Sequence, residues 1–444
     1  MTTCLATASA VASCSSGGES KVDLEKSDAA VDASMTGADA DDAGVLDATP
    51  PRDAAPFDGG PLPVVCTTPP CATSLATTFG GSDARDAPDR SEGFCALLAD
   101  GTVACWGANG AGQLGRGDDA GTLDSPTAVR VVGLSDVTQL DHTCARDKSG
   151  GVWCWGTGPF LRSDAGAVTT ERSPVKLPLP PAKSIGMGRN VGCAALDDGV
   201  VCWGTNDSGQ LAPFESVPAS AVIPPRPIEL PSGAPIRDIA ISAATFVVRE
   251  DGTTSSWGAN PPLARLSALF PDPNPSAIAL ERIASLDVAL NAACATAGGI
   301  GYCWGASYSV AIGYQPDNLD RALPEPVVAP EPLVQIATTR VTFTTLGAVV
   351  QPQRWCAVAA SGSVYCWGYN AGGQAGDGTK NHAFEAVRVQ GLPAPAAQVK
   401  TMLQSTCALL TNGKVYCWGT NYYGQLGNGK LRTPSLVPQE VVLP

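Results

Sequence analysis

A hairpin that ends in Trp-Gly returns seven times along this chain of 444 residues. The copies are CALLADGTVACWG (95–107), CARDKSGGVWCWG (144–156), CAALDDGVVCWG (193–204), FVVREDGTTSSWG (246–258), CATAGGIGYCWG (294–305), CAVAASGSVYCWG (356–368) and CALLTNGKVYCWG (407–419). Their tryptophans are 47 to 63 residues apart. Repeats of this size are supersecondary units that cannot bury their apolar surface alone, and they build solenoids or propellers. The repeat therefore limits the architecture more than any other feature.

The spacing within each hairpin places its two cysteines opposite each other. Five copies have a three-residue loop that ends in Gly, such as Ala99-Asp100-Gly101, and this loop needs a left-handed third residue. The copies at 193 and 294 are one residue shorter and keep the register with a two-residue loop. Gly298-Gly299 suits such a turn better than Asp197-Asp198 does. Opposed residues of an antiparallel pair lie about 4.5–5.5 Å apart, within reach of a disulfide.

This register predicts six hairpin disulfides, and a CTTPPC segment predicts a seventh. The fourth copy has lost both cysteines together, to Phe246 and Ser256, as expected for a covalent pair. The predicted pairs are Cys66–Cys71, Cys95–Cys105, Cys144–Cys154, Cys193–Cys202, Cys294–Cys303, Cys356–Cys366 and Cys407–Cys417. Disulfides persist in oxidising compartments, so we expect an exported protein. The alternatives are reduced structural thiols or a zinc site, but zinc spacing is absent and the only histidines are His142 and His382.

Both faces of the predicted hairpin are apolar. Alternate residues of a strand point to opposite faces, and in the first copy one face carries Cys95, Leu97, Val103 and Cys105, the other Ala96, Leu98, Ala104 and Trp106. A sheet that is buried on both faces is typical of a propeller blade between two neighbours rather than of an open sandwich.

Each period contains four predicted strands. In the second period they cover residues 137–140, 142–146 and 152–155 and a proline-bounded segment at 175–179. The first strand of the chain, 73–79, has no proline-bounded strand before it, and the last one, 437–443, has no partner period after it. We therefore expect the C-terminal strand to complete the N-terminal blade and to close a ring of seven blades.

Three segments are expected along the chain: a signal segment at 1–14, a linker at 15–71 and the propeller at 72–444. Residues 11–14, VASC, resemble the lipobox of bacterial lipoproteins with Cys14 as the lipidated residue, and the alternative is an ordinary polar N-terminus. Residues 15–65 carry 11 acidic and three basic residues with almost no aromatics. Such a composition cannot bury enough apolar surface to fold, so it predicts a disordered acidic tether.

Charge and hydropathy exclude two further classes. The formal net charge is −14 and there is no basic stripe, which argues against nucleic-acid binding. No apolar run reaches 18 residues, so a transmembrane helix is not predicted. We expect a monomer that contacts a membrane only through a lipid on Cys14, as an outer-membrane or cell-surface lipoprotein, or a secreted protein.

The hairpins and the segments that follow them resemble the regulator of chromosome condensation repeat family. The pattern N-x-x-G-Q-L-G-x-G is complete in WGANGAGQLGRG (106–117) and WGTNYYGQLGNG (418–429) and near-complete in WGYNAGGQAGDG (367–378). The resemblance covers about 370 residues and implies a seven-bladed propeller. We interpret the Gly-rich tail as a turn between blades rather than a phosphate loop, because no Lys-Ser/Thr follows it. The Trp-Arg-His-Thr cluster of plant ultraviolet receptors in this family is absent.

Three functions compete at this stage. The first is a non-catalytic interaction module that binds a protein or a glycan through loops on one propeller face. The second, implied by the family's founding member, is guanine-nucleotide exchange, which an exported chain could not perform on a cytosolic GTPase. The third is a hydrolase or lyase, which would need converging acids or a histidine-based pair in the channel or on one face. No such set is evident, so we predict no catalytic residue, no metal and no cofactor.

The irregular segments are the candidate binding regions, because recognition usually resides in loops on a rigid scaffold. They are residues 83–92, which are charged, residues 261–275, which interrupt the fourth period, and residues 308–324, which replace the fifth tail. We expect removal of the charges from 83–92 to change binding and to leave stability unaltered.

Overall fold

The computed structural model describes residue 57 and residues 59–78, 92–161, 168–188, 190–211, 222–305, 321–339, 342–343, 349–351 and 354–444. Cys14, the rest of the predicted signal and the larger part of the predicted tether lie outside them. The described chain is all-β except for a three-residue 3-10 turn at Asp118–Ala120. None of its helical segments has the length and apolarity to cross a bilayer.

Seven four-stranded antiparallel sheets, here called blades 1 to 7, follow one another along the chain. Blade 1 contains β1 (Ala72–Thr77), β2 (Gly93–Leu98), β3 (Val103–Gly107) and β4 (Ser125–Arg130); blade 2 contains β5 (Val137–Asp141), β6 (Cys144–Asp147), β7 (Val152–Gly158) and β8 (Thr169–Lys176). Blade 3 contains β9 (Ser184–Met187), β10 (Val191–Ala195), β11 (Val200–Gly204) and β12 (Ile223–Ile228); blade 4 contains β13 (Ile236–Ile241), β14 (Ala244–Arg249), β15 (Thr254–Gly258) and β16 (Asp272–Ala277).

The remaining blades repeat this order, with one insertion. Blade 5 contains β17 (Ile283–Ala289), β18 (Ala292–Ala297), β19 (Ile300–Gly305) and β20 (Arg321–Val327); blade 6 contains β21 (Leu333–Thr338), β24 (Arg354–Ala359), β25 (Val364–Gly368) and β26 (Ala383–Arg388). Blade 7 contains β27 (Ala396–Thr401), β28 (Ser405–Leu410), β29 (Val415–Gly419) and β30 (Ser435–Glu440). A separate two-stranded sheet, β22 (Thr342–Phe343) and β23 (Val349–Gln351), lies between the first two strands of blade 6 in the sequence.

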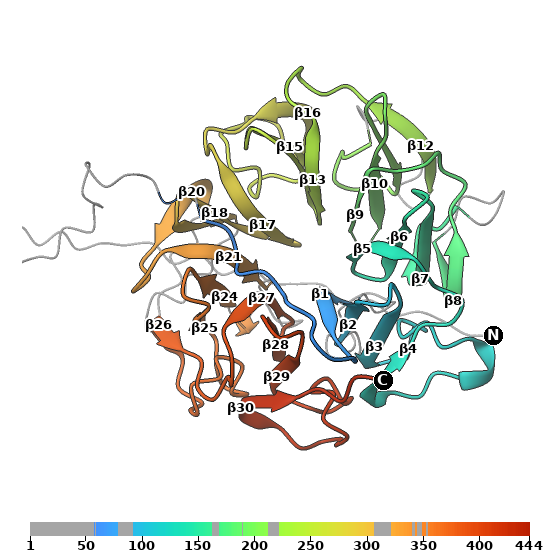
Figure 1. Ribbon diagram of the computed structural model, residues 1–444. Helices are drawn as coiled ribbons and strands as arrows, with labels where there is room; N and C mark the ends of the chain where they lie inside the picture. Colours follow the sequence, from blue (N-terminus) through green and yellow to red (C-terminus); the bar gives the residue numbers. More distant parts are fainter. Residues whose placement is uncertain are drawn as a thin grey trace, which may run out of the picture. The chain divides into compact units, whose positions relative to one another are not determined.

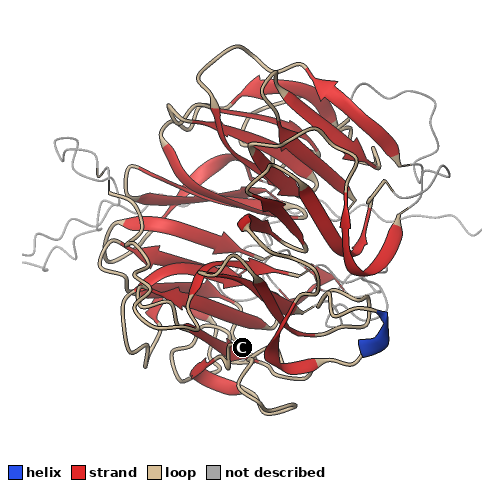
Figure 2. Ribbon diagram, turned by 45° about the vertical axis from the view of Figure 1, so that its right-hand side comes forward, coloured by secondary structure: helices blue, strands red, loops and turns tan. Residues whose placement is uncertain are grey.

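The blades form a ring with the first strand of each at the centre and the fourth at the rim (Figure 1). Each first strand contacts the first strand of the next blade, and β27 contacts β1. Figure 2 shows the ring from another side, with the 3-10 turn as the one helical segment drawn. We call the side with the loops between second and third strands the hairpin face. The side at which the third strands end is the Trp-Gly face, and the tail of a blade is the segment from its third to its fourth strand.

The predicted hairpin register is confirmed in every blade that has cysteines. Cys95 faces Cys105 and Cys294 faces Cys303, and all seven predicted disulfides are present. The six hairpin pairs have Cα atoms 4.0 to 4.1 Å apart. Gly101 has a φ of 77°, as the three-residue loop requires. Phe246 faces Ser256, so blade 4 keeps the register without the bond.

The predicted closure by a shared strand is wrong. Residues 435–440 pair with β29 of their own blade, and blade 1 already has its fourth strand in β4. The period therefore begins at the central strand and ends at the rim, so neither terminal strand lacks partners. The predicted strand at 437–443 begins two residues late, and the one predicted at 175–179 is β8, which ends at Lys176.

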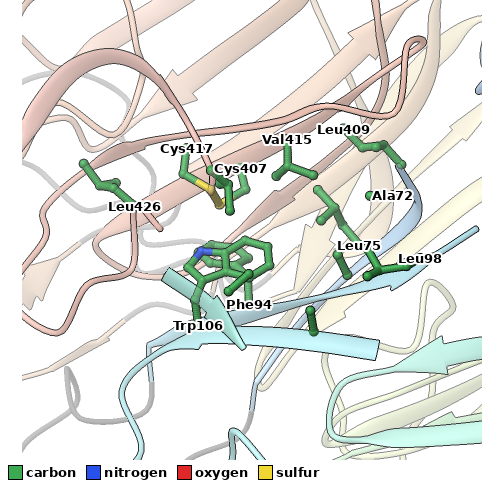
Figure 3. Packing of buried hydrophobic residues seen from close by; sticks show 14 residues of the cluster. Ala72, Leu75, Phe94, Leu98, Trp106, Cys407, Leu409, Val415, Cys417 and Leu426 are labelled. Atoms are coloured by element: carbon green, nitrogen blue, oxygen red, sulfur yellow. A yellow bond between two sulfur atoms is a disulfide. The ribbon is translucent and has the colours of Figure 1, made fainter. Parts of the chain in front are cut away.

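The ring is closed by contacts between blade 1 and blade 7 instead. Phe94 and Trp106 of blade 1 share an apolar cluster with Cys407, Cys417 and Leu426 of blade 7 (Figure 3). The backbone N–H of Ala128 donates to the carbonyl of Val442, and that of Gly429 donates to Pro126. Blade 1 and blade 7 therefore meet by face-to-face packing, as neighbouring blades do elsewhere in the ring.

The repeated tryptophan joins each blade to the one before it. The Trp106 indole N–H donates to the carbonyl of Gln425 at 3.0 Å, and Trp155 donates in the same way to Gln113 at 2.9 Å. Trp203, Trp257, Trp304 and Trp418 repeat the bond, while the tail that precedes Trp367 lies outside the described residues.

The Gly-rich tails are structural, as the sequence predicts. In blade 1 the Asn109 side chain accepts from the N–H of Leu114, and the Gln113 side chain accepts from that of Ala111. Gly112 and Gly115 have φ angles of 70° and 61°, which residues with a side chain rarely adopt. The conserved pattern within the chain thus shapes the loop whose carbonyl receives the next tryptophan.

Candidate functional site

The central strands hold the ring together with side chains that reach into the channel. Gln139, Gln335 and Gln398 each bind both the N–H and the C=O of one residue on the next central strand. The Gln398 amide, for example, accepts from Leu75 N–H at 2.8 Å and donates to its carbonyl at 3.2 Å. These positions serve the same purpose as the tryptophans, nearer to the axis.

A cluster of charged side chains lies along the same strands and forms the polar lining of the channel. Its members, the channel cluster, are Asp141, His142, Asp238, Asp287 and Lys400. Lys400 forms a 2.9 Å ion pair with Asp287. The carboxylates of Asp141 and Asp287 also accept from the N–H groups of Met187 (2.7 Å) and Thr338 (2.9 Å) on the following blades. Two of the three carboxylates therefore have a structural role.

The protein environment shifts the pKa values of three groups in this cluster: Asp238, His142 and Lys400. Desolvation by the surrounding channel wall, and secondarily the negative charge of Asp141, raises the pKa of the Asp238 carboxyl, which lines both the narrow cavity and the larger space above it. Burial lowers the pKa of His142, whose Nδ1 lies 2.9 Å from the Thr77 hydroxyl. For Lys400, burial acts to lower the pKa, but Asp287 outweighs it and the pKa is raised. Lys400 is thus a permanent cation, and Asp238 is the carboxyl most readily protonated.

The space beside the channel cluster is small. The cavity that the five residues line has a volume of about 160 Å³, the volume of roughly five water molecules. Pockets for substrates of enzymes are usually larger, about 300–1,000 Å³. In the described part of the chain, no group of three or more His, Cys, Asp or Glu side chains has the geometry for a metal ion. The cavity therefore suits water or a single small group.

A segment that the sequence assigns to the linker covers the mouth of the channel on the hairpin face. Residues 59–71 run across the ring from blade 5 towards blade 1 (Figure 1). Val64 packs against the cluster that joins blades 1 and 7, and Val65 N–H donates to Thr411 O at 2.7 Å. Pro61, Leu62 and Val64 line a space of about 550 Å³ above the channel. We call residues 59–71 the strap; its apolar side chains and the Cys66–Cys71 bond explain why it packs here.

The three predicted binding segments have different outcomes. Residues 83–91 and 308–320 lie outside the described residues, so those two predictions stay predictions. Glu92 is fully buried, and its carboxylate accepts from the N–H of Gln404 and the hydroxyl of Ser405 in blade 7. The expectation that its charge is dispensable for stability is therefore wrong, because Glu92 holds the joint between blades 1 and 7.

A buried arginine that the sequence did not indicate contacts the same turn of blade 7 from the joint with blade 6. Arg354 of blade 6 is fully buried and donates to the Thr406 hydroxyl at 2.6 Å and to the carbonyl of Ser405 at 3.1 Å. Burial lowers its pKa to about 10, and the charge of Glu92 opposes that shift. Arg354 and Glu92 therefore hold one turn of blade 7 from two sides.

The third segment, 261–275, is described in full and exposes three large apolar side chains. The tails of blades 1, 4 and 7 expose Leu123, Leu266, Leu269, Phe270, Tyr422 and Leu431 to solvent. Leu266 and Phe270 are 76% and 81% exposed. Exposed apolar side chains that lie close together, as the three within five residues of blade 4 do, mark an interaction surface.

The structure thus defines a seven-bladed β-propeller built from a stapled hairpin repeat. The regulator of chromosome condensation (RCC1) repeat model matches residues 404–425. The chain is 28% identical over 349 residues to the ultraviolet-B receptor UVR8 of Arabidopsis thaliana, covering 75% of this chain and 64% of the receptor. It is 31% identical over 181 residues to the guanine nucleotide exchange factor SRM1 of Saccharomyces cerevisiae, covering 37% of each. These matches and the seven-bladed fold support an RCC1-repeat protein.

Solved structures of low identity agree on the fold. Prp20p from Saccharomyces cerevisiae matches with a TM-score of 0.60 at 18% identity, over 78% of this chain and 87% of that one. Human WBSCR16 matches with a TM-score of 0.57 at 18% identity, over 78% and 94% of the two chains. The chain spans less than two thirds of the length of each of the two curated relatives named above.

Sequence reasoning missed the channel cluster. It placed His142 in no functional context, although His142 and Asp141 are neighbours at the channel end of a central strand. One signal was available in the aligned central strands. The position that holds Asp141, Asp287 and Lys400 in three blades holds a small residue in the other four: Ala76, Gly186, Ala240 and Ala337. Charged residues at a position that is otherwise small indicate a polar channel.

Proposed function

We propose that the protein is an exported, non-catalytic interaction module that binds a partner protein or glycan through the tails on its Trp-Gly face. The observation that carries this proposal is the set of six large apolar side chains that the tails of blades 1, 4 and 7 leave exposed. Repeat scaffolds use rigid frames to present such loops. The seven disulfides are typical of a protein that folds in an oxidising environment outside the cytosol. A lipid on Cys14 would tether the propeller to a membrane surface.

The test is capture of partners by the full chain from the secreted and envelope fractions of its own cells. Leu123→Ser with Leu431→Ser removes apolar side chains from two tails, and Val328→Ser removes an exposed valine (77%) between blades 5 and 6 as the matched control. We expect the control to capture the same partner as the natural chain and the tail variant to capture less. Unchanged capture both by this variant and by Leu266→Ser with Leu269→Ser in the tail of blade 4 would refute the proposal.

Guanine-nucleotide exchange is the first competing function, because one relative carries that name. The disulfides weigh against it, since a small GTPase of the cytosol would not meet a chain that folds in an oxidising compartment. Accelerated release of labelled GDP from a small GTPase by the oxidised, full-length chain would replace the proposed function with this one.

The second competing function is that of a hydrolase, and the channel cluster is the observation in its favour. Asp238 with a raised pKa is the residue that could act as a general acid. Against it, the cavity of about 160 Å³ is too small for a sugar or a nucleotide, and the space of about 550 Å³ that Asp238 also lines has no second acidic side chain among the described residues around it. Turnover of a glycan, peptide or nucleotide that Asp238→Asn abolishes without loss of the fold would establish this alternative.

A further inference from the structure

One tail differs from the others in how it is built. The tail of blade 4, residues 259–271, lacks the Gly-rich pattern and exposes Leu266, Leu269 and Phe270 within five residues. Two residues earlier its base is fully buried, because Leu263 and Ala264 belong to the apolar cluster between blades 4 and 5. Pro262 also receives the indole N–H of Trp304 from blade 5 at 2.9 Å. The exposed side chains therefore project from an anchored base.

Asp272 fixes the tail from its other end. Its carboxylate accepts from Arg265 (2.7 Å), the Ser267 hydroxyl (2.7 Å) and the Asn274 backbone N–H (3.0 Å). The Arg265 and Asp272 side chains are only 13% and 6% exposed. The Asn260 side chain spans the tail by donating to the carbonyls of Ser267 and Leu269. The segment that bears the apolar side chains is thereby hydrogen-bonded at Arg265, Ser267 and Leu269.

The lost cysteine position takes part in this arrangement. Ser256 occupies the place of the second hairpin cysteine, and its hydroxyl donates to the carbonyl of Leu263 at 2.6 Å. The Ser256 carbonyl accepts from Arg265 at 3.1 Å. In the stapled blades the corresponding sulfur is bonded across the hairpin and cannot donate the bond that the Ser256 hydroxyl makes to Leu263. The loss of the disulfide in blade 4 is thus coupled to the anchoring of its tail.

The charges of the tail restrict what can bind there. Arg265 and Asp272 are the only charged residues between 259 and 275, and they neutralise each other. A glycan needs hydrogen-bonding groups, which these three side chains lack, and an anionic membrane would not attract a chain of net charge −14. A pocket in a protein, lined by neutral apolar groups, is the complementary surface. Rigid apolar anchors that fill such pockets supply much of the affinity of protein complexes.

We infer that Leu266, Leu269 and Phe270 form a preorganised apolar anchor that docks into a neutral apolar pocket of a partner protein. This inference rests on the proposed function and assigns its principal contact to blade 4. Because the anchor is held rigid before binding, little conformational entropy is lost when it docks.

The test is site-specific photocrosslinking with the full chain in its own cells. A benzoyl-phenylalanine replaces Phe270, and a second chain carries it at Phe384, an aromatic residue of the rim strand β26 that is 55% exposed and lies outside the tails, as the matched control. We expect a discrete protein adduct from position 270 and not from position 384. An excess of the natural full chain should lower its yield about tenfold, whereas Leu266→Ser with Leu269→Ser should fail to compete.

Asp272→Ala tests the rigidity of the anchor separately. It leaves all three apolar side chains in place, so the adduct from position 270 should weaken while circular dichroism and the seven disulfides show an intact propeller. Should Asp272→Ala fail to fold, Ser267→Ala removes one bond of the same network and serves as the second variant.

The remaining outcomes separate the two proposals. An adduct from position 270 only with lipid, or only with a second copy of this chain, overturns the anchor. The anchor is also overturned if the chain with Leu266→Ser and Leu269→Ser competes as well as the natural chain, or if Asp272→Ala leaves the adduct yield from position 270 unchanged. If position 270 gives no protein adduct but Leu123→Ser with Leu431→Ser still lowers partner capture, the anchor is overturned and the proposed function is kept, whereas the absence of both the adduct and any captured partner contradicts both.

Discussion

Blade 1 and blade 4 have the same four strands and the same tryptophan, but they are held in different ways. Blade 1 has a disulfide across its hairpin and a Gly-rich tail whose Asn109 and Gln113 satisfy the backbone within the loop. Blade 4 has neither, and its tail is tied to Asp272 and Ser256 instead. The comparison shows that the repeat requires the tryptophan joint and the register, whereas the means of fixing the tail can be exchanged.

The exchange has a consequence for the surface. The tail of blade 1 uses its backbone and its polar side chains to form the loop and exposes one large apolar residue, Leu123. The tail of blade 4 is fixed by side chains at its two ends, so the residues between them are free to point outwards. The blade without the staple is therefore the one that presents a rigid apolar group.

Reduction should have the largest effect and should separate the two kinds of blade. Each hairpin bridge contributes at most about 3 kcal/mol, and six are lost together. The hairpin cysteines are buried except for Cys303, which is half-buried, whereas Cys66 is exposed, so thiols should appear first at Cys66 and Cys71. Urea unfolding with and without dithiothreitol, with thiols counted at each step, measures this. An unchanged midpoint after complete reduction would contradict the view that the staples hold six blades.

Loss of the repeated tryptophan should be the next largest effect, and equal in the two blades. Trp106→Ala and Trp257→Ala each remove a fully buried indole and its bond to the preceding tail. We expect each to lower the free energy of unfolding by about 3–5 kcal/mol, as for a core aromatic. Mild proteolysis should then cut blade 4 but leave the hairpin of blade 1 linked by its disulfide. A much smaller loss at Trp257 would mean that blade 4 does not depend on the common joint.

Acid should loosen the tail of blade 4 and spare that of blade 1. Burial alone would raise the pKa of Asp272, but hydrogen bonds from Ser267, Asn274 and Arg265 lower it to about 2 from an ordinary 3.8. Its folded pKa is the lower one, so its stabilisation is present above about pH 4 and is lost as the pH falls through about 2. At neutral pH it amounts to about 2 kcal/mol.

The measurement is the difference in unfolding free energy between the natural chain and Asp272→Asn from pH 2 to pH 7. The difference should shrink as the pH falls. Asp251→Asn, in the exposed hairpin loop of the same blade, is the control and should show little effect at any pH. A difference that is independent of pH would assign the effect to packing rather than to the carboxylate.

Restoring the missing staple should have the smallest net effect. Phe246→Cys with Ser256→Cys places two cysteines in the opposed register, so the bond should form. The gain of at most about 3 kcal/mol is offset by the loss of Phe246, which is buried and packs 5.9 Å from the Trp304 ring, and of the Ser256 bond to Leu263. Thermal unfolding should shift little, and hydrogen exchange at 263–270 should speed up. A large stabilisation with an unaltered tail would refute the coupling between the lost bond and the anchor.

The repeat made the fold and the disulfides predictable, because a hairpin register is determined locally by loop length. The phase of the period was not predictable in this way. A proline-bounded strand at 437–443 has the same pattern whether it pairs with β29 or with β4, and only the packing of the whole ring decides. The role of Glu92 was hidden for the same reason, because Gln404 and Ser405, which it contacts, are more than 300 residues away.

The candidate sites also differ in how much of each could be predicted from the sequence. The interruption at 261–275 was visible in the sequence as a break in the period, whereas its anchoring by Asp272 depends on side-chain directions that no spacing specifies. The channel cluster comes from single residues on different central strands, Asp141, Asp238, Asp287 and Lys400, and only ring closure brings them together.

The joint between the last blade and the first is chemically the same as the others, because Trp106 donates to Gln425 as Trp155 donates to Gln113. The two ends of the propeller are also neighbours, since Pro444 and the Cys66–Cys71 loop line one pocket. A ring with such a seam has no fixed starting point. A circular permutant that joins these ends and opens between blades 3 and 4 would have its new ends in those two blades. The bond from Trp257 to Gln210 would then close the ring, and the other described tryptophan joints would be unchanged. A cyclic shift of the coding sequence by whole repeats would therefore leave the ring of blades unchanged.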